Sequence, residues 1–479
     1  MRDKLYKFNR IYFLDNGYGV RGGANFVIQL INYLLDYTNI KVGIIDFIDG
    51  YITQNLVGKS IDFIDYASEN WDIPDNSIIF VPTERLCLLK NIVNKRNNIK
   101  IITILWETRI GWHILYPSNV LKNFTKLLYK TNSLMFLDQG CQIALENQLN
   151  HKFSPQYLPL YLPFSQSFET RHIINDKEIN IAWLGRLSDS KCFTLLNVMK
   201  KFNNLKTEKK KRIHIIGHGL WEENLRRKII DLNLNSIEII FLGKLEGDIL
   251  DEYLINNIDV LFAMGTSLLH GARLTIPSVG VSETLNPNLD LDKFIWLFDE
   301  EGFQLGLSDD VSLISSKAKS MQEILNEAFY QKEIIGTKCY MYALEKHCNI
   351  KDTINKLLAY SADTKLTYTH IKKLFKRLPF VDYIIKTFYL AKINLLQILK
   401  YNKKIFERRI SIFGLPFYKK VSQNGIDYYY LFNVLFYKKQ SWNKKFNKLN
   451  ILYKIKCKII KKEIVGQYSF PNIFDKTLK

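Results

Sequence analysis

Two cationic residues follow a predicted strand in the second half of the chain. The run INIAWLG at 179–185 is typical of a buried strand, and Arg186 and Lys191 come after it, before a predicted helix at 193–203. Fixed cations at the carboxyl end of a strand can clamp a diphosphate and neutralise the charge that grows on it as it leaves. We therefore predict electrostatic catalysis by Arg186 and Lys191; a solvated loop pair is the alternative.

Turns after the next predicted strands offer further contacts to the same ligand. Glycine lets backbone amides approach an anion closely, and a helix N-terminus adds its partial positive charge. The segment 243–246 lies where a nucleobase could rest on backbone groups. The ligand that carries the diphosphate would be the donor of a transferred group. The candidate donor-binding residues in these turns are Gly217, Gly219, Leu245, Gly265, Thr266 and Ser267.

The first loop of the chain, LDNGYGVRGGANF, is rich in glycine. Gly17, Gly19 and Gly22 fit the G-x-G-x-x-G pattern between a predicted strand and a predicted helix. A nicotinamide cofactor would also require an acid about 20 positions further on, where Asp46 and Asp49 are roughly placed. Three interpretations stay open: a dinucleotide site, a tight turn without a ligand, and a glycine loop that contacts a donor or acceptor.

Short apolar runs alternate with helical patterns over 11–360. Such alternation predicts parallel sheets covered by helices on both faces. A proline-rich seam at 153–167 separates two units of similar size. We therefore expect an α/β protein of two tandem Rossmann-like domains facing a cleft, at 1–160 and 161–345, with a closing helix at 346–360.

The positive charge of the chain is concentrated in its last quarter. Residues 361–479 contain 26 Lys and Arg against 6 Asp and Glu, which equals the whole net charge of +20. Two segments, 410–421 and 428–440, are strand-like and contain FYKK, which suggests a degenerate pair of hairpin repeats. Basic residues interleaved with apolar ones predict docking of this tail on an anionic membrane surface. A solvated basic extension is the alternative, and no nucleic acid is expected because no known binding signature is present.

The cysteines and the apolar runs indicate where the protein works. None of the six cysteines forms a CxxC pair, which favours reduced, mostly buried thiols in a reducing compartment. We see no signal peptide and no run of the ~18 apolar residues that a spanning helix requires. We expect a cytoplasmic protein that is peripheral on the inner face of the plasma membrane.

The motifs occur in an order that resembles one family. GRLxxxK at 185–191, GxG at 217–219, FLGxL at 241–245 and a helix exit T-I-P at 275–277 resemble retaining glycosyltransferases of the GT-B fold, group 1 type. The RGGA helix start at 21–24 is similar to the first loop of that family. The setting that this resemblance implies is the assembly of bacterial surface glycans such as lipopolysaccharide or capsule.

The resemblance also implies an activity and residue roles. The protein would move a hexosyl group from a nucleoside-diphosphate donor to a glycan or lipid-linked acceptor, with retention and with neither metal nor cofactor. Arg186 and Lys191 would hold the donor diphosphate, and Gly22 and Gly23 would lie near the transferred sugar. No protein nucleophile is implied.

One position departs from the family pattern. The family usually carries a Glu-x7-Glu pair whose second glutamate binds the donor ribose, and here His270 takes that place, with Phe262 eight residues earlier. Neutral histidine accepts only one hydrogen bond. We therefore keep two alternatives to the enzyme, a non-catalytic glycosyltransferase homologue that acts as a binding or scaffold protein and an NAD-dependent oxidoreductase.

The acceptor side of the first predicted domain has its own candidates. LWETRIGWH at 105–113 follows a predicted strand, so Glu107 and His113 could face the cleft. A surface helix start is the alternative interpretation.

Overall fold

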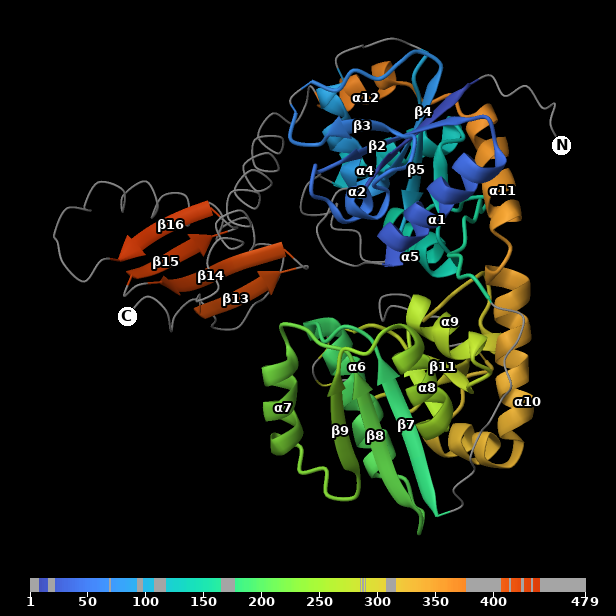
Figure 1. Cartoon of the computed structure of the whole chain (residues 1–479), viewed down its shortest axis with the longest axis vertical. Helices are drawn as coiled ribbons and strands as arrows, with labels where there is room; N and C mark the ends of the chain where they lie inside the picture. The colour runs from blue at the N-terminus through green and yellow to red at the C-terminus, as the bar shows by residue number, and fades with distance from the viewer. Residues whose placement is uncertain are drawn as a thin grey trace. The chain divides into compact units, whose positions relative to one another are not determined.

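The structure is a computed structural model of the whole chain, and it forms two compact units, Met1–Pro379 and Phe380–Lys479 (Figure 1). The residues that it describes are 8–15, 22–68, 70–92, 98–106, 118–164, 177–284, 286, 288, 290–306, 316–375, 406–412, 415–423, 426–431 and 434–439.

The first domain of the first unit is built on a parallel sheet of six strands, in the order β3-β2-β1-β4-β5-β6. The central strands are buried along almost their whole length, as expected when helices cover both faces. The strands are β1 (Arg10–Leu14), β2 (Lys41–Asp46), β3 (Asp62–Asp65), β4 (Ser77–Pro82), β5 (Lys100–Leu105) and β6 (Leu134–Phe136). The helices are α1 (Gly22–Tyr37), α2 (Tyr51–Asn55), η1 (Thr83–Asn91), α4 (Ser118–Lys130) and α5 (Gln139–Leu149).

The second domain repeats this plan with the order β12-β11-β10-β7-β8-β9, in which only the β11–β12 pair is antiparallel. The predicted pair of tandem Rossmann-like domains is confirmed. The strands are β7 (Glu178–Leu184), β8 (Lys210–Ile216), β9 (Glu238–Gly243), β10 (Val260–Ala263), β11 (Ser278–Gly280) and β12 (Ile295–Trp296). The helices are α6 (Asp189–Asn203), α7 (Glu222–Asp231), α8 (Gly247–Asn257), α9 (Thr266–Arg273), η2 (Leu297–Asp299) and α10 (Met321–His347).

Local sequence signals fix where several helices begin and end. Asp138 caps α5 by accepting a hydrogen bond from the amide of Cys141 at 2.8 Å. Ser320 and Glu323 form a reciprocal capping box at the start of α10. At the C-terminal end of α6, the buried ammonium of Lys211 donates to backbone carbonyls that the last turn leaves unpaired, among them Asn203 O at 2.7 Å.

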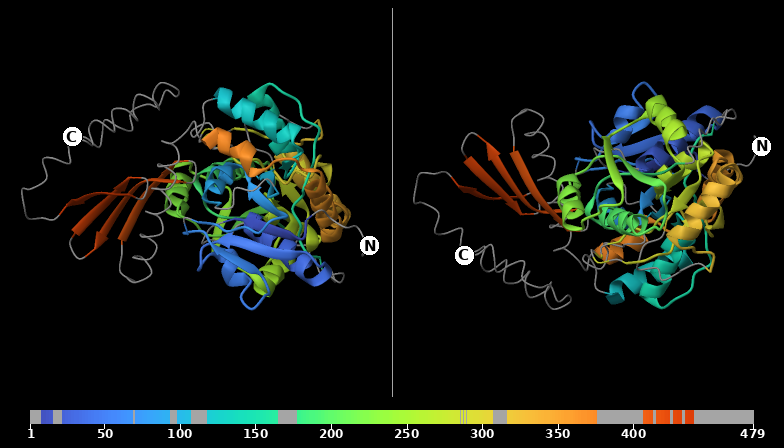
Figure 2. Two further views of the ribbon diagram at one scale, coloured as in Figure 1. Left: turned by 90° about the horizontal axis from the view of Figure 1, so that it is seen from above. Right: turned by 90° about the horizontal axis from the view of Figure 1, so that it is seen from below.

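The chain returns to the first domain after α10. Helix α11 (Ile350–Asp363) packs against α1, and α12 (Tyr368–Phe375) follows it. The amide of Ile101 in β5 donates to the carbonyl of Leu366 at 2.9 Å. Figures 1 and 2 show α10 and α11 following each other along one side of the unit.

This return corrects the expected boundary of the tail. We expected the tail to start at 361, but the first unit continues to Pro379. The reason is burial, because Leu366 and Ile371 are completely buried, whereas residues of a free basic extension would be exposed. The closing helix expected at 346–360 corresponds to α11.

The second unit contains one antiparallel sheet in the order β13-β14-β15-β16. Figure 2 shows its four strands side by side as one twisted ribbon. The strands are β13 (Phe406–Ile412), β14 (Leu415–Gln423), β15 (Ile426–Leu431) and β16 (Val434–Lys439). Among the residues that the structure describes, no helix has the length and apolarity needed to cross a membrane.

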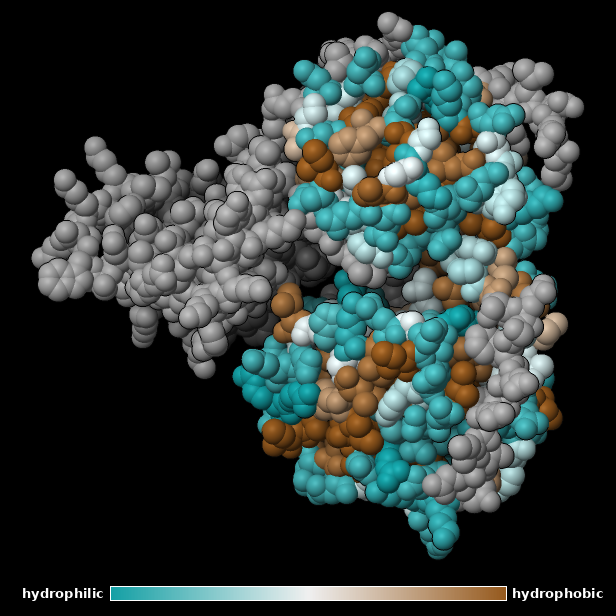
Figure 3. Space-filling view, in the orientation of Figure 1, coloured by the Kyte–Doolittle hydropathy of each residue, from teal (hydrophilic) through white to brown (hydrophobic). Residues whose placement is uncertain are grey.

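The surface of the first unit is mixed on the face drawn in Figure 3. Hydrophilic residues there are interspersed with small apolar patches over both domains. Exposed apolar side chains of the second domain include Leu220, which precedes α7, and Ile249 in the first turn of α8. Scattered exposed apolar residues of this kind are normal for globular proteins.

A glycine inside α10 should be essential for the packing of the second domain. A Cβ built on Gly336 would lie 1.9 Å from the carbonyl oxygen of Thr275, a backbone atom that cannot rotate away. We expect Gly336→Ala to destabilise the first unit by about 1–3 kcal/mol through overpacking. Thermal unfolding should therefore shift to lower temperature, whereas Thr337→Ala, at the exposed neighbouring position, should leave the transition nearly unchanged. Equal transitions for the two variants would contradict this account of the packing.

Candidate functional site

Each sheet of the first unit has a point where the strand order reverses. In the second domain this switch lies between β7 and β10, because β8 and β9 continue on one side and β11 and β12 on the other. Open parallel sheets bind ligands beyond the carboxyl ends of the strands at such switch points. The carboxyl ends of β7 and β10 therefore define the candidate site.

The two predicted cations lie at this edge. Arg186 follows β7 and is exposed, and among the described residues its side chain has no hydrogen-bonding or ion-pair partner. Lys191 is half-buried in the first turn of α6, because this helix begins at Asp189 and not at 193 as predicted. A ligand at Arg186 would thus also meet the positive end of α6.

The glycine turn after β8 holds the loop of Arg186 in place. A Cβ on Gly217 would lie 2.0 Å from the carbonyl oxygen of Gly185, and one on Gly219 would lie 2.3 Å from that of Leu187. The amide of Leu187 also donates to the carbonyl of His218 at 3.1 Å. The described contacts of both glycines are therefore with the neighbouring loop, which gives a structural reason for glycine besides the predicted approach to a ligand.

Helix α9 begins beside Arg186. Leu184 pairs with Ala263 in the β7–β10 register, so Arg186 and Gly265 each lie two residues beyond the same rung. Gly265 adopts φ 63° and ψ −139°, a conformation open mainly to glycine, and its amide donates to Leu305 O at 2.6 Å. This hydrogen bond fixes the start of α9 beside the carboxyl ends of β7 and β10.

The starts of α9 and α1 meet across the two domains of the first unit. A Cβ built on Gly22 would lie 3.5 Å from Thr266 Cγ2, whereas one on Gly23 would meet nothing within 4 Å. Within the described residues, the amides of Gly22, Gly23, Thr266 and Ser267 have no hydrogen-bond acceptor. Two positive helix ends in contact repel each other, so an anion bound between them would relieve the repulsion.

The loop after β9 completes the rim of the site. Leu245 is half-buried there and packs against the core of the domain. Its neighbours Lys244 and Glu246 form an ion pair at 2.6 Å. Because Gly243 O accepts from the amide of Gly217 at 2.7 Å, this loop lies directly beside the glycine turn.

His270 is already engaged within the second domain. Its Nε2 lies 2.7 Å from Oδ1 of Asp251 on α8, and Arg273 also binds this carboxylate at 2.7 Å. Burial alone would raise the pKa of Asp251, but the hydrogen bonds and charges of His270 and Arg273 outweigh it and lower the pKa. An ionised carboxylate requires Nε2 of His270 to donate, which leaves Nδ1 of the neutral ring as an acceptor. The imidazole is 20% exposed and can receive one ligand hydroxyl.

An ion pair occupies the switch point of the first domain, between β1 and β4. Asp15 follows β1, Arg85 lies in η1 after β4, and their side chains form a largely buried salt bridge. Neither residue is among the site residues predicted from the sequence, although an acid directly after a buried strand was a usable signal. Glu107 and His113, the predicted acceptor-side residues, lie outside the described residues.

Asp46 does not have the environment of a cofactor-binding acid. It is buried, and it accepts hydrogen bonds from the amide of Phe47 at 2.8 Å and the hydroxyl of Thr53 at 3.1 Å. These bonds use it to hold the turn before α2. The described part of the chain also contains no group of three or more His, Cys, Asp or Glu that could hold a metal ion.

The loop 300–306 links the candidate site to the first domain. Its Leu305 carbonyl anchors Gly265, as described above, and its Gly302 carbonyl accepts from the amide of Gln139 in α5 at 2.8 Å. The side chains of Gln304 and Gln139 are joined by a hydrogen bond of 3.3 Å. A displacement of this loop would therefore also move the start of α9.

Two buried carboxyl groups support this link. Burial raises the pKa of Glu300 to about 8, with the nearby Asp138 as a further cause. Burial likewise raises the pKa of Asp138, the cap of α5, to about 6. One oxygen of Glu300 has no hydrogen-bond partner among the described residues, as expected of a carboxyl group that stays protonated at neutral pH.

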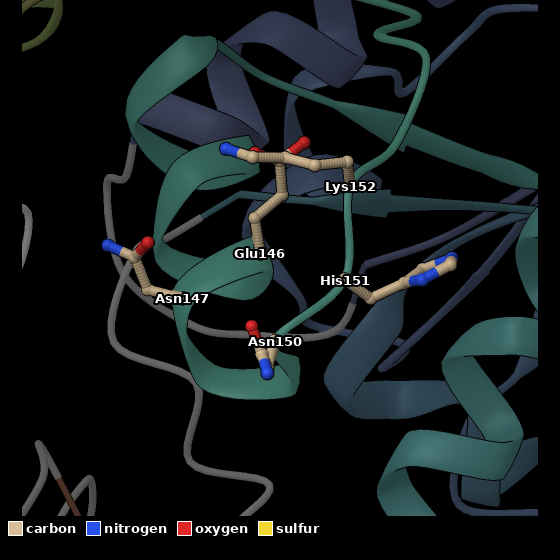
Figure 4. A pocket seen from close by; sticks show the side chains of 5 residues that line it. All are labelled: Glu146, Asn147, Asn150, His151 and Lys152. Atoms are coloured by element: carbon tan, nitrogen blue, oxygen red, sulfur yellow. The ribbon is translucent and has the colours of Figure 1, made fainter.

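A surface hollow lies at the far end of α5, away from the strand ends of the site (Figure 4). Its lining side chains are Glu146, Asn147, Asn150, His151 and Lys152. Glu146 is satisfied internally, since it binds the amide of Phe153 at 2.9 Å and the ammonium of Lys152 at 2.9 Å. These contacts stabilise the end of the helix and give no reason to place a ligand there.

No protein-family model matches the sequence, and no curated protein matches it. The chain is similar in structure to HepE of Anabaena, solved with UDP and glucose (13% identity, 73% of this chain and 99% of that one, TM-score 0.46). It is also similar to the lipopolysaccharide outer core galactosyltransferase WaaB (13%, 73% and 99%, TM-score 0.47) and to WaaG, a glycosyltransferase involved in lipopolysaccharide biosynthesis (12%, 73% and 98%, TM-score 0.41). At such low identity, the fold rests on the strand orders given above.

The raised pKa of Glu300 predicts a pH-dependent stability of the first unit. Between about pH 4.5, its ordinary pKa, and about pH 8, the folded protein holds a proton that the unfolded chain has released. The free energy of unfolding therefore falls as pH rises through this window. The stabilisation that Glu300 contributes is fully present only below the window. Glu300→Gln cannot ionise, so its thermal transition should decline less than that of the wild type between about pH 5 and about pH 9.

The exposed neighbour Glu301 provides the matched control for this measurement. Glu301→Gln should follow the wild-type pH profile of thermal unfolding. If Glu300→Gln followed that profile as well, Glu300 would not be the buried acid that we describe.

Proposed function

We propose that the protein transfers a sugar from a nucleoside-diphosphate donor to a glycan or lipid-linked glycan acceptor at the cytosolic face of a membrane. The observation that carries this proposal is the meeting of Arg186, the start of α9 and the start of α1 at the switch point of the second sheet. This arrangement suits a ligand with two phosphates, which needs several donors on different sides.

The residues of the site have distinct parts in this reaction. The bond from the anomeric carbon to the diphosphate breaks and the diphosphate leaves with the electron pair. The oxygen of an acceptor hydroxyl bonds to the carbon, and its proton passes to an oxygen of the leaving diphosphate. Arg186 can bind the leaving group with two parallel hydrogen bonds, and Lys191 adds a point charge. The free amides at Thr266 and Ser267 stabilise the same developing charge.

The transferred sugar would lie at the start of α1. The space beside Gly23 is open among the described residues, so a sugar could approach the helix without meeting a side chain. The donor ribose would lie near His270, which offers one acceptor where a carboxylate would offer two. Retention of configuration, without a protein nucleophile, follows from the family resemblance and is part of the proposal.

The basic segment of the second unit supports the membrane part of the proposal. Residues 380–479 contain 21 Lys and Arg against 5 Asp and Glu, which is +16 of the net charge of +20, and anionic lipid attracts basic segments by about 1 kcal/mol per residue close to the surface. Docking there would hold the two domains near a lipid-linked acceptor.

A second candidate function is a non-catalytic homologue that binds a partner enzyme or a glycan. The observation that favours it is the engagement of His270 by Asp251 and Arg273, which leaves a single acceptor at this position. Thermal shift with a panel of nucleotides separates the two functions, because a protein that responds to no nucleotide would fit only the binding role.

The diphosphate clamp is tested by removing both cations. We expect Arg186→Ala with Lys191→Ala to lower the turnover of the preferred donor by about 100-fold or more, because the leaving group loses its fixed charges. Release of nucleoside diphosphate from a panel of nucleotide sugars, uridine diphosphate sugars first, gives the readout without a known acceptor. Lys206→Ala with Arg227→Ala removes two charges from exposed positions outside the site and should leave turnover unchanged. Undiminished turnover of the first variant would refute the clamp.

A further inference from the structure

The strand register of the second unit contains a structural repeat. Two hairpins, β13–β14 and β15–β16, are each joined by two residues. The register of each hairpin skips one residue at the same place, Phe417 in the first and Phe436 in the second. These residues open the two FYKK motifs, so each motif begins at a bulge. The hairpin pair suggested by the sequence is a true duplication of backbone register.

The first hairpin places four cationic residues in a block. Lys419 stands opposite Arg409, and Lys420 stands opposite Arg408. Successive residues of a strand belong to opposite faces, so each face holds one pair of like charges. Like charges directly opposite each other destabilise a sheet, and the positions on β15 beside them hold tyrosines and no acid.

The second hairpin treats the equivalent lysines differently. Lys438 stands opposite Tyr428, and Lys439 stands opposite Asp427. The repeat therefore keeps the lysine pair but places a neutral ring or an acid where the first hairpin has arginine. Only the first hairpin of this sheet has like charges opposed at both rungs.

We propose that Arg408, Arg409, Lys419 and Lys420, the first-hairpin block, form the contact through which the protein binds an anionic lipid surface. The inference deepens the proposed function, on which it rests for the presence of a membrane acceptor. Phosphate groups of lipid between the opposed cations would offset their repulsion, because no acid stands directly opposite either pair and the nearest acids of these strands, Glu407 and Asp427, lie one diagonal away.

The position of the block in the sheet fits a broad anionic surface. β13 is an edge strand among the strands that the structure describes, so Arg408 and Arg409 lie at that edge of the sheet. On β15, Tyr429 stands opposite Lys420 of β14, and Tyr430 stands opposite Lys419. Tyrosine is enriched where proteins meet the interface of a membrane, whereas charge alone would suit a nucleic acid equally well. Lipid is therefore the partner to which we commit.

The duplication supplies a matched test on the full-length protein. Lys419→Gln with Lys420→Gln and Lys438→Gln with Lys439→Gln remove the same two charges from equivalent register positions. Co-sedimentation would use vesicles of phosphatidylcholine with and without phosphatidylglycerol. We expect the first variant to bind anionic vesicles about tenfold more weakly than the wild type, and the second less than about threefold more weakly.

Two further variants guard against misfolding as the cause. Lys419→Arg with Lys420→Arg keeps the charge and should bind like the wild type. Arg408→Gln with Arg409→Gln removes the other half of the block and should weaken binding as much as the lysine variant does. Circular dichroism should be the same for all variants, and no variant should unfold at a lower temperature than the wild type, because removing half of the block relieves repulsion within the sheet.

Three outcomes would overturn the proposal. They are equal losses for the two lysine variants, no preference of the wild type for anionic vesicles, and binding of single-stranded DNA in place of vesicles. The enzymatic proposal is read separately from nucleoside diphosphate release in solution. Block-dependent vesicle binding by a protein that releases none would leave the first-hairpin block standing and refute only the transfer reaction.

Discussion

Two helices of the first unit point their positive ends at the same place, and this contact organises the site. The starts of α1 and α9 meet at Gly22 and Thr266, with Arg186 on the neighbouring strand end. Without an anion, this accumulation of positive charge is unfavourable. Gly265 makes this start of α9 possible, because its φ of 63° would be strained in another residue, whereas a Cβ at Gly22 would lie at an ordinary contact distance of 3.5 Å from Thr266 Cγ2.

The same edge is coupled to the rest of the first unit through buried polar groups. The loop 300–306 holds the start of α9 with one carbonyl and the start of α5 with another. Glu300 in this loop and Asp138 at the cap of α5 are acids whose pKa values are raised by burial. Buried carboxyl groups of this kind cost stability when they ionise. Their presence next to a candidate active site suits a functional role for the loop as well as a structural one.

The division of the chain into two units matches a division of charge. The compact part up to Pro379 carries the candidate site, whereas the sheet of β13 to β16 carries two pairs of directly opposed cations. The two units can therefore be tested apart from each other, one by nucleotide chemistry and the other by lipid binding.

The sequence by itself determined the two tandem α/β domains, because buried parallel strands and amphipathic helices have distinct periods. It also determined the position of Arg186 and Lys191 after β7, since the motif and the strand are contiguous in the chain. It could not predict three contacts, which are Asp15 with Arg85, His270 with Asp251 and Gly22 with Thr266. Each contact joins separate elements, and their spatial order does not follow from local sequence patterns. The extent of the first unit was likewise decided by tertiary structure, through the burial of Leu366 against β5. Local patterns fix elements and strand ends, whereas contacts between distant segments depend on which strands become neighbours.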